Sequence, residues 1–113
     1  MSGVSLIDTR VLGKPSQFHG KEKEFLEWRE NFASWAELHP AVGSLLDAAG
    51  KEKTPINYEK LPPDMRTMAH LLFHVLMQVC KNKAFTLVRR VNVETKCRNG
   101  FEAWRRLIRR FHV

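Results

Sequence analysis

The fold of this chain is decided by the stretch FLEWRENFASW, residues 25–35, in which aromatic side chains recur at steps of three and four. This spacing places Phe25, Trp28, Phe32 and Trp35 on one face of an α-helix, with most charged residues on the other faces. Acidic residues fill the first turns, where they favour the helix dipole. The pattern therefore predicts a helix over residues 21–38.

A second aromatic framework lies near the other end of the chain. It reads NGFEAWRRL over residues 99–107 and closes with Phe111. Asn99 is a favourable N-cap, so we expect a last helix over residues 99–112. Residues 64–81 are apolar on most sides, which is typical of a central helix. We expect the two aromatic stripes to cover that helix from opposite ends of the chain, with a core that comprises Phe18, Phe25, Trp28, Phe32, Leu72, Leu76, Trp104, Leu107 and Phe111.

The remaining segments complete an all-α architecture. Shorter helices are predicted over residues 40–49, which Gly50 stops, and over residues 83–91, with a break at 92–98. Residues 1–20 contain Gly13, Pro15 and Gly20 and show no helical period, so we expect a short extended arm. The sequence thus predicts one compact domain, a bundle of about five helices over residues 21–113 that follows this arm.

The charge of the chain is concentrated at its C-terminal end. The 113 residues carry a net charge of +7, and residues 81–113 hold ten Lys or Arg against two Glu, whereas the first 80 residues carry about −1. On the last helix the face opposite the aromatic stripe holds Glu102 and a row of arginines. That row could contact nucleic-acid phosphates or an acidic partner, or could simply be solvated. Its members are Arg105, Arg106, Arg109 and Arg110.

No arrangement of residues in the sequence indicates catalysis. There is no nucleophile elbow and no glycine-rich phosphate loop. His70 and His74 stand four residues apart and could face one metal ion, but they supply only half of a zinc site. We therefore interpret the two histidines as a polar stripe at a surface or a pH-sensitive contact. For the protein as a whole, we expect that it is not an enzyme and has no cofactor, metal or small-molecule substrate.

The two cysteines and the hydropathy pattern bear on location. Cys80 and Cys97 belong to no paired motif, so we expect reduced thiols, with a disulfide between them as the alternative. No apolar run approaches the roughly 20 residues that span a bilayer, and no secretory signal pattern is present. We expect a cytoplasmic, intracellular protein that does not enter membranes.

The order of these motifs resembles the capsid region of Gag polyproteins of LTR retrotransposons, copia-type and gypsy-like, or of domesticated Gag-derived proteins. Pro15, Phe18 and Gly20, followed by Phe25-x-x-Trp28 and Phe32, are similar to the opening of that region. Ala103-Trp104 and the closing Phe111 are similar to its last conserved element. The resemblance spans about residues 12–112 and implies the N-terminal lobe of a capsid. The chain departs from complete Gag proteins because it contains neither a second lobe nor a zinc knuckle.

The resemblance implies a structural protein that self-associates in a retroelement particle, with RNA as a further partner of the full-length protein and virus-like particles as one location. Two alternatives stay open: a nucleic-acid-binding module that uses the basic last helix, and a peptide-binding or partner-binding adaptor. We take the exposed residues Glu27, Glu30, His70 and His74 as candidate subunit contacts. Pairing of the acidic side of helix 21–38 with the arginine row of another copy is the contact that we favour.

Overall fold

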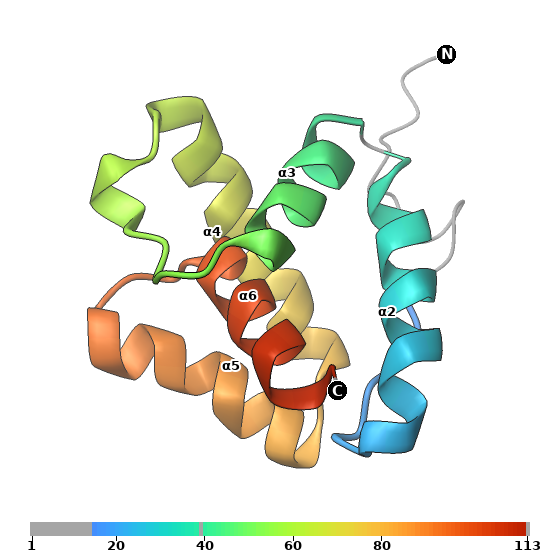
Figure 1. Ribbon diagram of the computed structural model, residues 1–113. Helices are drawn as coiled ribbons and strands as arrows, with labels where there is room; N and C mark the ends of the chain where they lie inside the picture. Colours follow the sequence, from blue (N-terminus) through green and yellow to red (C-terminus); the bar gives the residue numbers. More distant parts are fainter. Residues whose placement is uncertain (1–14, 39, 113) are drawn as a thin grey trace.

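The computed structural model describes residues 15–38 and 40–112, and over these residues it contains helices and no strand (Figure 1). The all-α prediction with about five helices is thus confirmed for the described part. The extended arm is seen at residues 15–20, and the rest of the predicted arm lies outside the described residues. The elements are α2 (Glu22–Ala36), α3 (Pro40–Lys51), the 3₁₀ turn η1 (Tyr58–Lys60), α4 (Pro63–Val79), α5 (Asn82–Thr95) and α6 (Gly100–Phe111).

Two helices are longer than the sequence predicts. α5 begins at Asn82 and continues into the expected break as far as Thr95, where Lys96 ends the helix in the left-handed region with a φ of 62° and donates its backbone N–H to the carbonyl of Asn92. α3 continues through Gly50 to Lys51. A Cβ atom on Gly50 would lie 3.3 Å from Nε1 of Trp104, so this glycine permits a close approach between α3 and α6 and does not stop the helix.

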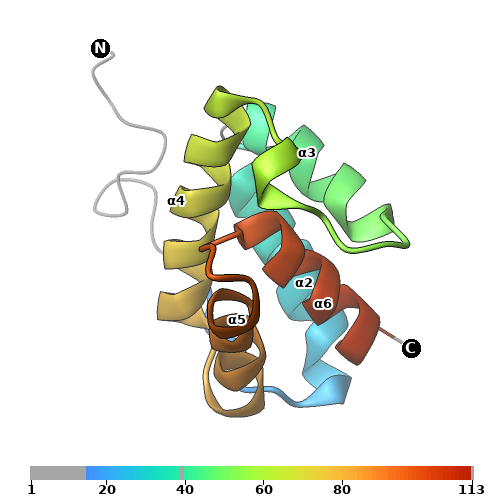
Figure 2. The same ribbon diagram turned by 90° about the vertical axis from the view of Figure 1, so that its left-hand side faces the viewer.

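The central helix is α6, which corrects the expectation that helix 64–81 occupies the centre. α6 packs against α3, α4 and α5 and is surrounded by the other helices in both views (Figures 1 and 2). α4 keeps an exposed side with His70, Leu71 and His74. Although its sequence is more apolar, α4 covers one side of α6 and remains open to solvent on the other.

The start of α6 lies directly against α4. A Cβ atom on Gly100 would lie 2.5 Å from the backbone nitrogen of Phe73 and 2.6 Å from the carbonyl oxygen of Ala69. Only glycine fits at this position, because both neighbours are backbone atoms. The side chain of Asn99 accepts a hydrogen bond from the Glu102 backbone, as predicted for an N-cap.

The two aromatic frameworks pack on each other, and the one on α6 also packs against α4, but α2 does not cover α4 from the other side as we expected. Phe32 stacks on Trp104 with ring centroids 5.2 Å apart, and Phe25 stacks on Phe111 at 5.7 Å. Phe18 of the arm stacks on Trp28 at 5.0 Å. All nine residues predicted for the core are buried, so that prediction is confirmed. The arm, α2 and α6 together form one aromatic cluster.

The arm is fixed by backbone hydrogen bonds as well as by its ring. The N–H of Phe18 donates to the carbonyl of Val79 at 2.9 Å, and the N–H of Lys81 donates to the carbonyl of Phe18 at 2.8 Å. The indole N–H of Trp28 donates to the carbonyl of Ser16 at 2.7 Å. The arm therefore bridges α2 and the junction between α4 and α5.

Candidate functional site

The predicted arginine row of the last helix does not form one exposed surface. Arg105 is buried, and its guanidinium donates to both carboxylate oxygens of Glu102 at 2.8 Å. Arg106 bridges Glu102 and Glu94 at 2.8 and 2.9 Å. The prediction of an exposed arginine row is therefore wrong for Arg105, and Arg106 is held in ion pairs within the fold.

The outer end of the row is only partly available. Arg110 pairs with Glu22 of α2 at 2.9 Å. Arg109 is exposed and has no carboxylate partner among the described residues. Glu22 of helix 21–38 thus pairs with an arginine of the last helix within one chain, whereas the pairing that we expected joins two copies.

A loop that the sequence leaves unplaced explains why Glu102 is buried. The backbone N–H of Ile56 donates to Glu102 Oε1 at 2.8 Å, and the side chain of Asn99 donates to the carbonyl of Ile56 at 3.0 Å. Burial by itself raises the pKa of Glu102, but hydrogen bonds from Arg105, the Ile56 backbone and Arg106 outweigh it and hold that pKa below its ordinary value. The carboxylate therefore holds the loop to α6, and Arg106 extends this link to Glu94 on α5.

Exposed cations lie instead on α5, where no site was predicted from the sequence. Lys83, Arg89 and Arg90 lie on the side opposite the buried residues Ala84, Val88 and Val91, and Val93, which is 50% exposed, lies among them. We call Lys83, Arg89, Arg90 and Val93 the basic face of α5. Its one carboxylate contact within the described chain is a loose one of 3.9 Å, between Arg90 and Glu94. The residues of the basic face are spaced as on a helix, so the sequence contains this pattern. It was missed because the helix predicted there, residues 83–91, is too short to include Val93.

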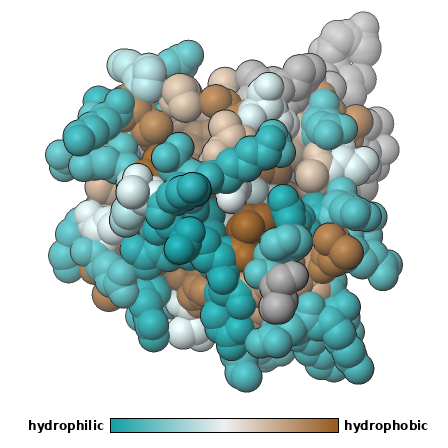
Figure 3. All heavy atoms as spheres, in the orientation of Figure 1, coloured by the Kyte–Doolittle hydropathy of each residue, from teal (hydrophilic) through white to brown (hydrophobic). Residues whose placement is uncertain are grey.

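The outer side of α2 has the opposite charge. Leu26 is 54% exposed and lies beside Glu27 and Glu30, which are also exposed and form no ion pair with any described residue. We call Leu26, Glu27 and Glu30 the acidic face of α2. Because α2 buries Phe25, Trp28 and Phe32 on its inner side, this face points away from the core. Figure 3 shows that the side of the molecule drawn there is mostly hydrophilic, with hydrophobic residues in small separate spots.

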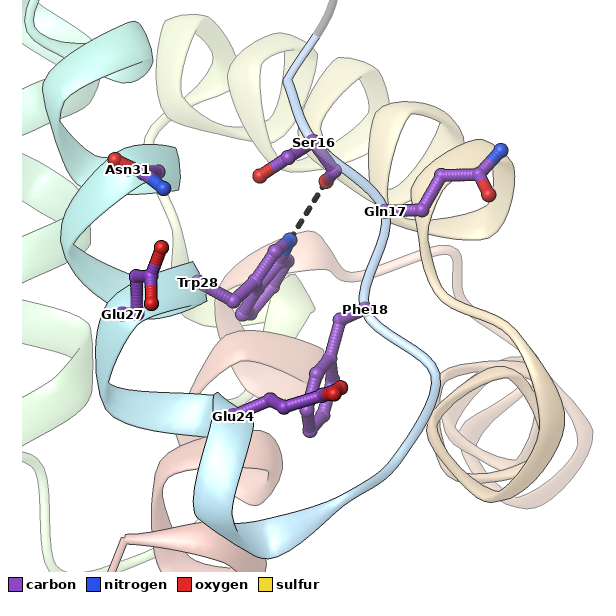
Figure 4. Close-up of a pocket in the computed structure, with 7 residues that line it drawn as sticks. All are labelled: Ser16, Gln17, Phe18, Glu24, Glu27, Trp28 and Asn31. Carbon is purple, nitrogen blue, oxygen red and sulfur yellow. Dashed lines mark hydrogen bonds between the residues drawn. The ribbon is translucent and has the colours of Figure 1, made fainter.

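A groove of about 270 Å³ runs between the arm and α2, next to the acidic face. Figure 4 shows Trp28 and Phe18 between the two segments, with Glu24 and Glu27 on the helix side. Both rings are almost completely buried, so the groove offers mainly its polar rim to a partner. The lining residues are Ser16, Gln17, Phe18, Glu24, Glu27, Trp28 and Asn31.

The two histidines lie together on the exposed side of α4, as their spacing predicted. Their Nε2 atoms are 3.0 Å apart. Partial burial, the neighbouring His70 and the nearby Arg98 all lower the pKa of His74. Over residues 15–38 and 40–112, no group of three or more His, Cys, Asp and Glu side chains is arranged to hold a metal ion.

The cysteines are free thiols, so the alternative of a disulfide is wrong for this structure. Cys80 is buried, and burial raises its pKa to about 12 against the weaker opposing effect of Lys81. A thiol with so high a pKa is a poor nucleophile at neutral pH. Cys80 is therefore a small core residue, as the sequence indicated, and Cys97 is half-buried.

Within the described segments, no helix has the length and apolar character needed to cross a bilayer. Comparison with known proteins gives no relative: no family model matches the chain, and neither a curated protein nor a solved structure is significantly similar to it. The functional reading therefore depends on the residues and on their arrangement.

Proposed function

We propose that this chain is a non-catalytic structural module, similar to the N-terminal lobe of a Gag capsid, that self-associates in a retroelement particle. The resemblance of the two motifs supports this proposal, because the residues that carry it share one aromatic core. The described residues form five α-helices, and an all-α domain is also the architecture that the resemblance implies. A cytoplasmic location, within virus-like particles, follows from the same proposal.

The observation that carries the proposal is the position of the exposed charged side chains that do not hold the fold together. Glu102, Arg105 and Arg106 are engaged within the fold, whereas Glu27 and Glu30 on α2 and the cations of α5 are exposed on outer helix faces. An exposed aliphatic side chain accompanies each group, Leu26 on α2 and Val93 on α5. Charged surfaces with an apolar centre are suited to contacts between macromolecules.

Self-association is tested by measuring the mass in solution as the concentration of the chain rises from roughly 10 μM to 1 mM, the range of weak protein contacts. The proposal predicts a mass that rises with concentration and falls again at high salt. A monomer over the whole range would overturn it.

Binding of nucleic acid is a second candidate, and the basic face of α5 favours it. About four phosphate contacts on a single strand would give a slope near −3 for the logarithm of the binding constant against the logarithm of salt concentration. Binding of a fluorescent single-stranded RNA in a salt series tests this alternative. A chain that shows no binding at low salt would exclude it.

The adaptor alternative has less support. The groove beside the arm is wide enough to be considered for a peptide, but its aromatic walls are buried and its rim is acidic. A peptide-binding groove normally offers accessible apolar pockets for side chains. We therefore place self-association before peptide binding.

A further inference from the structure

The start of α5 lies beside the arm at Gly20, but the rest of α5, which carries Arg89, Arg90 and Val93, lies on a different side of α6 from α2. In Figure 1 α6 stands between α2 and α5. Each helix turns its buried residues inward, Phe25, Trp28 and Phe32 on α2 and Ala84, Val88 and Val91 on α5. The two exposed faces consequently point away from each other, and the pairing of one with the other requires a second molecule.

The two faces also match in their internal spacing. On α2, Leu26 and Glu30 are four residues apart, and on α5, Arg89 and Val93 are four residues apart. Residues at this spacing lie one above the other on a helix, with Cβ atoms about 6 Å apart. If the helices are laid antiparallel, Leu26 can rest on Val93 while the carboxylate of Glu30 meets the guanidinium of Arg89.

We propose that the acidic face of α2 in one copy docks on the basic face of α5 in a second copy. The inference rests on the proposed self-association and names its contact surfaces. It replaces the arginine row of α6 as the cationic partner, because Arg105 and Arg106 are bound to Glu102 and Arg110 is bound to Glu22.

Such a contact is heterologous, because each copy contributes a different face. Neither face is complementary to itself, since carboxylates would meet carboxylates and cations would meet cations. A contact of this type does not end at a dimer. It continues into an open chain or closes into a ring.

The individual contact is weak. One helix face against another buries less than the roughly 1,200 Å² of a standard stable interface. Exposed charges at such a contact are screened within about 10 Å at 0.1 M salt, so the association is salt-sensitive. A ring can nevertheless be more stable than a single contact, because the contact that closes it forms within one assembly.

The decisive experiment neutralises each face separately and then mixes the two products. One variant carries Glu27→Gln and Glu30→Gln, and the other carries Arg89→Gln and Arg90→Gln. We expect each variant alone to remain a monomer at concentrations where the unmodified chain assembles. In the mixture one intact acidic face and one intact basic face remain, so we expect a 1:1 dimer that does not grow further.

Matched controls separate this result from a general effect of charge. Glu52→Gln with Glu59→Gln, and Lys53→Gln with Lys60→Gln, remove the same charges from exposed positions away from both faces, and these variants should assemble as the unmodified chain does. Circular dichroism and thermal unfolding of each variant should match the unmodified chain, because all substituted side chains are exposed.

The outcomes distinguish the two proposals. If the unmodified chain assembles and both face variants assemble equally well, the docking is wrong and the proposed function stands. If either face variant alone still forms large assemblies while the other does not, the contact is not heterologous and the docking is also wrong. If the unmodified chain is a monomer throughout, the proposed function fails and the docking fails with it.

Discussion

Arg105 and Glu102 form a buried bidentate pair one turn apart on α6. Nε and Nη2 of Arg105 lie 2.8 Å from Oε1 and Oε2 of Glu102. Because Ile56 donates its backbone N–H to the same carboxylate, this pair fixes the loop before η1 to the central helix. The relationship explains why a strongly basic helix presents few free arginines to a partner.

We expect Glu102→Ala to destabilise the fold by about 3–5 kcal/mol, the usual cost of removing one member of a buried ion pair. The substitution leaves the guanidinium of Arg105 buried without a counter-charge and removes the acceptor of the Ile56 N–H. The free energy of unfolding, measured in urea, checks this expectation.

Glu94→Gln is the matched control for that variant. Glu94 accepts a hydrogen bond from Arg106 at the surface, so its loss should cost less than about 1 kcal/mol. Equal losses for the two variants would show that the buried pair does not stabilise the fold.

The stability of the chain should fall in acid in two steps. The pKa of Glu102 is lower in the folded chain than in the unfolded chain, so its carboxylate stabilises the fold at pH values above the unfolded pKa of about 4.3. This stabilisation is lost as the pH falls through the folded pKa. The lowered pKa of His74 means that the folded chain resists protonation, so stability also falls as pH drops below about 6.5, the ordinary pKa of histidine.

Urea unfolding at pH values between 3 and 8 tests both steps. His74→Gln should remove the step that begins near neutrality, and Glu102→Gln should remove the one that begins in acid. A chain whose stability is constant from pH 8 to 3 would contradict the role of both groups.

The fold was predictable from the sequence to a large extent, and the charged surface was less so. The spacing of Phe25, Trp28 and Phe32 fixed both the helix and its buried side, because apolar residues at that period have only one way to be buried. The covering of Glu102 was not predictable, because it depends on the loop at Ile56, which has no period of its own. An arginine on a helical wheel appears exposed until the loop above it is placed.

The prediction that helix 64–81 is the central helix was wrong for a related reason. α4 is richer in apolar residues, but α6 begins with Gly100, which admits the backbone of α4 at contact distance. A count of apolar residues does not register this kind of packing. For the same reason, the close approach of α3 to Trp104 at Gly50 was not predicted.

Trp104→Ala should cost about 3–5 kcal/mol, because the ring is buried against Trp28 and Phe32 and its removal leaves a large cavity. Leu26→Ala is a suitable control, since an exposed leucine should change the free energy of unfolding by less than about 0.5 kcal/mol. A loss below about 1 kcal/mol for Trp104→Ala would place that ring outside the core.

Gly100→Ala should destabilise the fold by about 3 kcal/mol, at the upper end of overpacking effects, because the new methyl group meets backbone atoms of α4 that cannot move alone. The higher helix propensity of alanine, worth about 1 kcal/mol, is too small to compensate. Gly50→Ala meets side-chain atoms at 3.3 Å or more and should be clearly milder in the same thermal unfolding measurement. The reverse order would contradict the close contact between α6 and α4.

Lys23→Glu should strengthen self-association. Lys23 is an exposed cation one turn before Leu26 and Glu27, and with Leu26 on Val93 in the antiparallel contact it would lie opposite Lys96 at the C-terminal end of α5. Replacing it should lower the concentration at which the chain assembles by about threefold, the effect of one exposed charge pair. Weaker assembly of this variant at low salt would show that α2 does not meet a basic surface.

The central claim is that the chain assembles through complementary faces. It is tested most directly by sedimentation equilibrium of the unmodified chain at low salt as its concentration rises. The account predicts a mass that climbs from the 13.2 kDa of one chain through successive multiples and returns toward 13.2 kDa when salt is added. A mass that stays at 13.2 kDa up to the highest concentration would contradict it.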